Sequence, residues 1–290
     1  MLVDQHLHLE RGPYTPENYP DSWLDLYLER AATAGVARLG VVEHGYRFLE
    51  ARGLLPGAWA EDRCRYRLDA YLGFVERVRQ RRLPVSCGIE MDYIAGAEEE
   101  IRRFLTRYPW DFVLGSVHFV DGVGVDLEAD AQLRRQMGQE TLWRRYFALS
   151  RAAIASGLFD VLTHPDLPKI FGERPPFALD TEYRLTAQAL AAADMAIECN
   201  TAGLRKPVGD IYPHRAYLRA ACAAGVPVSL GSDAHEPRDV GAGFDAAVDL
   251  LLESGYREAV HYIGRRRIAS SLGSGRQSRG ERGEAHPPTA

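Results

Sequence analysis

Lysine is nearly absent from this chain of 290 residues, since only Lys169 and Lys206 accompany the arginines among its 35 basic residues. Cysteine is also scarce, and its four residues lack the paired spacing of a zinc ribbon or a disulfide framework. No apolar run approaches the length of a membrane span, and no signal-peptide pattern opens the chain. These absences argue against a disulfide scaffold and a membrane protein, so we expect a cytoplasmic one.

The chain also has fewer basic residues (35) than acidic residues (40). The formal net charge is -5 at pH 7, which argues against nucleic acid or a membrane surface as the main partner. The composition, 46% hydrophobic and 26% charged, is typical of a globular protein whose length allows one large barrel. We therefore expect a small-molecule partner. Whether the chain forms a homo-oligomer is left open.

Strand-like runs alternate with helix-like stretches along most of the chain. The expected strands are residues 2–9, 38–44, 85–92, 112–120, 161–164, 195–201 and 226–235. The expected helices are residues 22–34, 67–82, 97–108, 141–156, 179–193, 213–224 and 244–254. This alternation predicts an α/β fold of parallel strands joined by crossover helices. Seven such units without an internal linker favour one barrel over residues 1–269.

The remaining segments do not follow this pattern. Residues 41–62 and 120–140 are expected to be long loops, and residues 259–267 either an eighth strand or a cover for the barrel. Gly, Ser, Arg, Glu and Pro dominate residues 270–290, which predicts a disordered tail.

Histidines and carboxylates gather at the carboxyl ends of the expected strands. They are His6, His8, His44, Glu90, His118, His164, Asp233 and His235. Because the carboxyl ends of parallel strands converge on one rim of a barrel, we expect these side chains to meet there. A cysteine-free set of imidazoles and carboxylates suits Zn, Fe or Mn. More ligands are present than one ion uses, so a bridging carboxylate such as Glu90 could hold two ions.

This ligand set resembles that of the polymerase and histidinol phosphatase superfamily, called PHP. The shared pattern is an N-terminal His-x-His, a single His, a Glu, two further single His and a late Asp-x-His. Residues 198–207, Glu-Cys-Asn-Thr-Ala-Gly-Leu-Arg-Lys-Pro, resemble the monofunctional histidinol-phosphate phosphatases of that superfamily. The resemblance implies a distorted (β/α)7 TIM-like barrel with metals at the C-terminal rim of its strands. It also implies hydrolysis of L-histidinol phosphate to L-histidinol and phosphate, a step of histidine biosynthesis.

The resemblance further implies two or three divalent ions and a division of the ligands among them. The first ion would be held by His6, His8, Glu90 and Asp233, the second by Glu90, His118 and His164, and the third by His44 and His235. The family usually adds to the third ion another histidine that follows His-x-His. This chain has none there, so Glu17 is the expected replacement and Glu10 the alternative.

A phosphate monoester also needs cations. Lys169, Arg205 and Lys206 follow the fifth and sixth expected strands, so we expect them to bind the phosphate, Arg205 by a bidentate fork. His214 lies in the loop after Lys206 and could touch the substrate. Catalytic roles are expected for the residues that surround the phosphoryl group, namely Arg205, Asp233 and His235. The proton for the leaving alkoxide comes either from Asp233 or from solvent at the metals.

Three other functions are compatible with parts of this pattern. A phosphodiesterase or exonuclease of the same superfamily would favour a basic face, which the net charge opposes. An amidohydrolase-like barrel also begins with His-x-His, but it typically bridges its metals with a carboxylated lysine on the fourth strand, and residues 114–119 contain no lysine. The third alternative is a non-catalytic metal-binding barrel.

Overall fold

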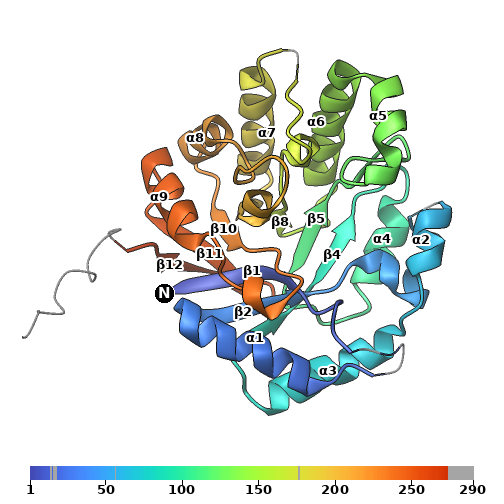
Figure 1. The fold of residues 1–290 in the computed structure, drawn as a ribbon, viewed down its shortest axis with the longest axis vertical. Coiled ribbons are helices and arrows are strands. Elements are labelled where there is room, and N and C mark those ends of the chain that lie inside the picture. Colours follow the sequence, from blue (N-terminus) through green and yellow to red (C-terminus); the bar gives the residue numbers. More distant parts are fainter. Residues whose placement is uncertain (14, 16–17, 56, 176, 274–290) are drawn as a thin grey trace, which may run out of the picture.

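The computed structural model describes residues 1–13, 15, 18–55, 57–175 and 177–273. In this part of the chain the strands gather at the centre and the helices surround them (Figure 1). The helices are α1 (Asp21–Ala34), α2 (Ala58–Arg63), α3 (Leu68–Gln80), α4 (Glu98–Leu105), α5 (Ala131–Met137), α6 (Gln139–Ala155), α7 (Asp180–Ala192), α8 (Arg215–Ala223) and α9 (Phe244–Ser254). None of these described helices is long and apolar enough to cross a membrane.

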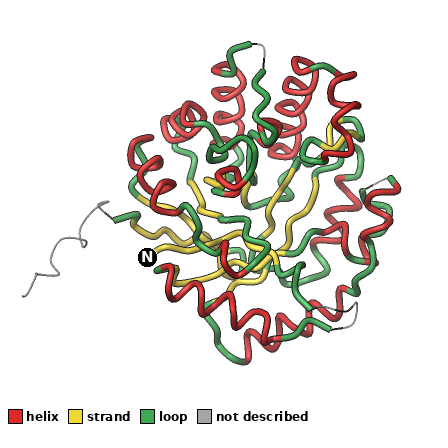
Figure 2. The backbone as a smooth tube through the Cα atoms, viewed as in Figure 1, coloured by secondary structure: helices red, strands yellow, loops and turns green. Residues whose placement is uncertain are grey.

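The central strands form two parallel sheets, seen as the yellow segments in Figure 2. The first sheet has the order β1 (Leu2–His8), β2 (Val36–Val42), β3 (Val85–Cys87). The second has the order β10 (Val228–Gly231), β9 (Ala196–Asn200), β8 (Val161–Leu162), β5 (Val113–Ser116), β4 (Ile89–Asp92). The strands are buried on both faces, as expected where helices cover a parallel sheet. The predicted α/β fold with parallel strands is confirmed.

Isolated bridges connect the two sheets at both of their edges. At one edge, His44, which follows β2, pairs in parallel with Glu90 on β4. At the other edge, Leu7 on β1 pairs in parallel with Ala234, which follows β10. Only Gly88 separates β3 from β4, so the single strand expected over residues 85–92 is split between the sheets. A Cβ at position 88 would lie 2.5 Å from the Phe112 carbonyl oxygen, which explains the glycine at this crossing.

The last strands, β11 (Glu258–Ile263) and β12 (Arg266–Ser271), form a separate antiparallel hairpin. Val260 and Tyr262 pack in one apolar cluster with Phe112 and Leu114, and the Tyr262 amide donates to the side-chain oxygen of Gln5 on β1 (3.0 Å). Of the two alternatives for this segment, the hairpin is a cover over the strands rather than another parallel strand. It extends to Ser271, two residues beyond the expected end of the domain, and residues 274–290 lie outside the described part.

The two segments expected to be long loops contain short elements. Residues 41–62 hold two 3-10 turns, Gly45–Arg47 and Leu49–Ala51, and most of α2. Residues 120–140 hold the hairpin of β6 (Phe119–Val120) and β7 (Val123–Gly124), together with α5. The long loops that were expected therefore contain elements that the sequence did not indicate, because elements this short show too little hydrophobic periodicity to be detected.

The strand that carries His-x-His contains a bulge. Between Asp4 and Leu7, β1 advances three residues while its partner β2 advances two, from Leu39 to Val41. The extra residue brings the Gln5 backbone against Gly40, where a Cβ would lie 2.6 Å from the Gln5 carbonyl oxygen. The bulge therefore requires glycine at position 40.

We predict that Gly40→Ala lowers the free energy of unfolding by about 1–3 kcal/mol, because the new methyl group must push β1 away from β2. Gly73→Ala is the control. Gly73 lies on the exposed side of α3 with nothing closer than 3.9 Å, so alanine there should stabilise the helix by about 0.5–1 kcal/mol. Urea denaturation of the two variants and the parent measures both effects. Equal stability of the two variants would contradict the bulge argument.

Candidate metal centre

Imidazoles and carboxylates from six separate segments meet at the carboxyl ends of the parallel strands. Strand β1 carries His6 and His8, β4 carries Glu90, and the other members follow β2, β5, β8 and β10 directly; these members are His44, His118, His164, Asp233 and His235. Most of their surface is buried, and Glu90 is only 1% exposed. The convergence expected from the sequence is therefore seen in the geometry.

One group of ligand atoms surrounds a point between β1 and β4. The Nε2 atoms of His6 and His8 lie 3.0 Å apart, and each lies 3.3 to 3.5 Å from Oε2 of Glu90. Oδ1 of Asp233 lies 3.8 Å from His6 Nε2 and 3.6 Å from His8 Nε2. Ligands at 2.0–2.1 Å from a tetrahedral ion are themselves separated by about 3.3 Å. These four residues therefore fit a single divalent ion.

The two oxygens of Glu90 face different sets of imidazoles. Oε2 faces His6, His8 and also Nε2 of His44 at 3.2 Å, whereas Oε1 lies 3.0 Å from Nε2 of His164 and 3.5 Å from Nε2 of His118. A carboxylate that presents one oxygen to each of two imidazole sets has the geometry of a bridging ligand.

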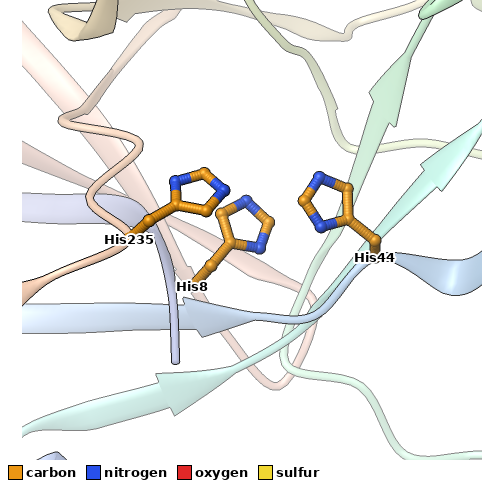
Figure 3. A group of neighbouring side chains, drawn as sticks. All are labelled: His8, His44 and His235. Atoms are coloured by element: carbon orange, nitrogen blue, oxygen red, sulfur yellow. The ribbon is translucent and has the colours of Figure 1, made fainter. Parts of the chain in front are cut away.

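A third group lies on the other side of His8, where Figure 3 shows that ring between His44 and His235. The His8 ring stacks on His44 at 4.1 Å and lies 4.5 Å from His235. Glu10 completes this group, with Oε1 3.1 Å from Nε2 of His235 and Oε2 3.4 Å from Nδ1 of His44. Hydrogen bonds from these two histidines outweigh burial and hold the pKa of Glu10 well below its usual range. Glu17, the expected replacement, lies outside the described residues.

Glu90 and His8 have the protonation states that bind a cation, whereas nearby carboxylates outweigh burial and raise the pKa of His6, His44 and His118, so that a bound cation would displace protons there. Burial alone would raise the pKa of the Glu90 carboxyl, but the charges of His44, His6 and His118 outweigh it and hold that pKa well below its usual range. Burial is the main reason that the pKa of His8 falls to about 3, with nearby histidine charges adding to the effect. An ionised carboxylate and a neutral imidazole are the forms that bind a metal ion.

A second layer of carboxylates holds these histidines in place. Glu198 on β9 lies 2.8 Å from Nδ1 of His6 through Oε1, and its Oε2 accepts the His164 amide at 2.8 Å. Asp92 lies 2.9 Å from Nδ1 of His118 in the same way. Sequence reasoning did not single out Glu198 as a partner of His6. The available signal was a charged residue within a strand whose five residues are all buried.

Two ligand residues have a left-handed backbone although neither is glycine. The φ angle is 26° at His164 and 51° at Asp233. Such conformations cost free energy in L-residues and are concentrated at functional sites. The loop before Asp233 is fixed by Asp4, which accepts hydrogen bonds from the amide and the hydroxyl of Ser232 (2.8 and 2.5 Å).

The expected phosphate-binding residues have different environments. Arg205, at the end of the 3-10 turn η5 (Ala202–Arg205), donates through Nη2 to the Ser232 carbonyl (2.6 Å), beside Asp233. Lys206 is exposed. His214 is the N-cap of α8, where its Nδ1 accepts a hydrogen bond from the Ala216 amide (3.2 Å). This side chain therefore has a structural role.

The contacts of Lys169 argue against its expected role in phosphate binding. Its ammonium group is buried and donates to Asp166 (3.0 Å), Asp210 (3.1 Å) and the Ile211 carbonyl (2.7 Å). An ammonium group has three donors, and these three contacts use all of them. Lys169 instead joins the loop after β8 to the loop before α8.

Residues 21–202, more than half of the chain, match the family model described as PHP domain. The chain belongs to the PHP domain family. A relative of this PHP chain, the "probable histidinol-phosphatase" of Deinococcus radiodurans, is 35% identical over 266 residues, covering 88% of this chain and 95% of the relative. The histidinol-phosphatase of Bacillus subtilis is 28% identical over 267 residues, covering 85% of this chain and 98% of the relative.

A solved structure shares the fold of this PHP chain. The crystal structure of histidinol phosphate phosphatase from Lactococcus lactis, complexed with zinc, L-histidinol and phosphate, superimposes with a TM-score of 0.71 at 19% identity. The match covers 92% of this chain and 98% of the other. The family expected from the ligand pattern is thus confirmed.

We predict that Glu198→Gln weakens metal binding by this PHP chain about 10–100-fold. The two oxygens of Glu198 contact Nδ1 of His6, the backbone amide of His164 and the side chain of Asn200, and glutamine has only one oxygen for these contacts. The control is Glu182→Gln on α7, which removes a carboxylate paired with Arg151 away from the cluster. Competition with a chelator, read by elemental analysis, measures the affinity. Equal retention of metal by both variants would contradict the orienting role of Glu198.

Proposed function

We propose that this chain is a metal-dependent phosphomonoesterase that hydrolyses L-histidinol phosphate to L-histidinol and inorganic phosphate. The bridging geometry of Glu90 carries the proposal, because a carboxylate between two sets of imidazoles suits the paired-ion chemistry of phosphoester hydrolysis. Membership in the PHP family and the names of the two curated relatives support the choice of substrate.

The proposed cofactors are two or three divalent ions of Zn, Fe or Mn, as the nitrogen and oxygen ligands favour. The ligands divide into His6, His8, Glu90 and Asp233 for the first ion, Glu90, His118 and His164 for the second, and His44, His235 and Glu10 for the third. Bound ions of this kind activate a water molecule and neutralise phosphoryl oxygens. Glu10 takes the place that the sequence assigned first to Glu17, because its carboxylate contacts both histidines.

The remaining chemistry falls to side chains around the cluster. Arg205 lies beside Asp233 and has five N–H donors, of which its contact with Ser232 uses a part, so we assign it to the phosphoryl oxygens. Lys206, which is exposed in the same loop, is assigned to attracting the anion. The charge of His6 and of other nearby histidines outweighs burial and holds the pKa of Asp233 far below its usual range. Asp233 is therefore ionised and suited to holding a cation; because a carboxylate with so low a pKa is a weak base, we assign the proton transfers to solvent at the metals.

We also infer that the two sheets act as one distorted barrel of seven strands within residues 1–269. The bridges at both sheet edges support this closure, since they connect β2 with β4 and β1 with the segment after β10. In this arrangement β3 and β4 count as one strand that bends at Gly88. The hairpin of β11 and β12 covers the barrel.

The substrate is tested by measuring phosphate release from four compounds, with Mn, Zn or Fe added back. They are histidinol phosphate, a simple alkyl phosphomonoester, a bis-ester and single-stranded DNA. We expect kcat/KM for histidinol phosphate to exceed the others by at least about tenfold, since a site that contacts the whole substrate rejects analogues lacking those groups. Faster turnover of the bis-ester or of DNA would favour the phosphodiesterase alternative. Absence of turnover with all four compounds would favour the non-catalytic one.

The third ion is tested with a matched pair, Glu10→Gln and Glu17→Gln. Because an amide is a much poorer ligand for these ions than a carboxylate, Glu10→Gln should lose about one metal ion per chain, and Glu17→Gln should lose none. Elemental analysis of the purified variants measures the stoichiometry independently of activity. Loss of metal in Glu17→Gln alone would reverse the assignment.

A further inference from the structure

Three aromatic side chains from separate segments form a wall beside the metal ligands. Tyr46 contacts Trp59 edge-on at 4.9 Å, and Trp59 contacts Phe119 edge-on at 5.4 Å. The wall adjoins the cluster directly, because the Tyr46 ring lies 4.8 Å from the His44 ring and Phe119 follows His118 in the chain. All three rings are only partly buried, so they are open to a bound molecule.

A carboxylate lies next to this wall. The amide of Val125 donates to the carbonyl of His118 (2.8 Å), which places the following residue, Asp126, at the rim of the cluster. Asp126 is half-buried, and among the described residues no hydrogen bond or ion pair engages its carboxylate. Its charge adds to the raised pKa of Tyr46, after burial and nearer carboxylates, and to the raised pKa of His118, where carboxylates led by Asp92 outweigh burial. A partly exposed carboxylate without a partner is available to pair with a cation from outside.

Arg205 and Asp126, which carry opposite charges, lie beside different members of the cluster. Arg205 lies beside Asp233, where the segments after β9 and β10 meet. Asp126 and the aromatic wall lie beside His118 and His44, which follow β5 and β2. Glu90 lies between the two sides, since its oxygens reach both His6 and His118. A molecule bound across the cluster would therefore meet a cation at one end and an anion with aromatic rings at the other.

We propose that Tyr46, Trp59, Phe119 and Asp126 form the subsite for the cationic, heteroaromatic end of the substrate. The proposal rests on the proposed function, since it requires that the phosphate binds at the metal ligands. Asp126 pairs with the ammonium group, and the rings pack against the imidazole.

The subsite is tested with Asp126→Asn, with Glu128→Gln as the matched control. Glu128 is exposed, lies two residues further along the chain and is not part of the wall. Loss of a charge-assisted contact should raise KM for histidinol phosphate about tenfold or more in Asp126→Asn, with KM for 4-nitrophenyl phosphate unchanged. Glu128→Gln should change neither. By contrast, Arg205→Ala should raise KM for both substrates.

Calorimetric binding of L-histidinol tests the subsite without turnover. Purified wild-type protein should bind L-histidinol, and Asp126→Asn should bind it about tenfold or more weakly, while its metal content and thermal midpoint match the wild type. Trp59→Leu should weaken this binding in the same direction.

The two proposals fail in different ways. Equal binding of L-histidinol by wild type and Asp126→Asn, or an equal rise in KM for both substrates, overturns the subsite even if histidinol phosphate is hydrolysed. Selective loss of L-histidinol binding in Asp126→Asn supports the subsite even if the substrate panel rejects the proposed reaction.

Discussion

The structure of the site depends on one buried charge, the carboxylate of Glu90. An unpaired ionised group with almost no exposed surface would lower the stability of the fold by several kcal/mol, so neighbouring groups must offset this desolvation. The imidazoles do so from both sides, with His164 on one oxygen and His8 on the other. Because these histidines come from distant segments, the strands that carry them must keep a fixed register. The bulge in β1 and the glycines at positions 40 and 88, which allow close backbone contacts, maintain that register.

The carboxylates of the second layer extend the same constraint outward. Glu198 contacts both the His6 ring and the His164 amide, so it links β1 to the end of β8. Gly231 on β10 permits this contact, since a Cβ there would collide with the Glu198 carboxylate and crowd the His6 Cβ. Asp4 fixes Ser232 and with it the turn to Asp233. His6, the His164 backbone and the turn to Asp233 are thus held by buried carboxylates on neighbouring strands, which is a common way of fixing a metal site.

The sequence predicted the convergence of these side chains well because their positions follow from strand ends, and strand ends converge in any parallel arrangement. It did not predict which side chains support them. Glu198 and His6 are separated by 192 residues, and no local pattern indicates that they touch. The contacts of Lys169 were hidden from the sequence for a related reason. Its rarity suggested a binding role, but its burial between Asp166 and Asp210 depends on how two loops pack, which spacing does not reveal.

The third group of ligands shows how a changed residue can keep the charge of a site. The family resemblance leads one to expect a neutral imidazole where this chain has Glu10, and a carboxylate there adds a negative charge. Arg47 compensates for it. Its Nη1 lies 3.3 Å from Glu10 and 2.5 Å from the buried Glu43, and its guanidinium stacks over Tyr66 at 4.2 Å. Because Glu43 is buried and close to Arg47, the arginine is held in place and its charge is shared between two carboxylates. On the proposed assignment, in which Glu10 binds an ion beside His44 and His235, Arg47 supplies a fixed cation behind the carboxylate.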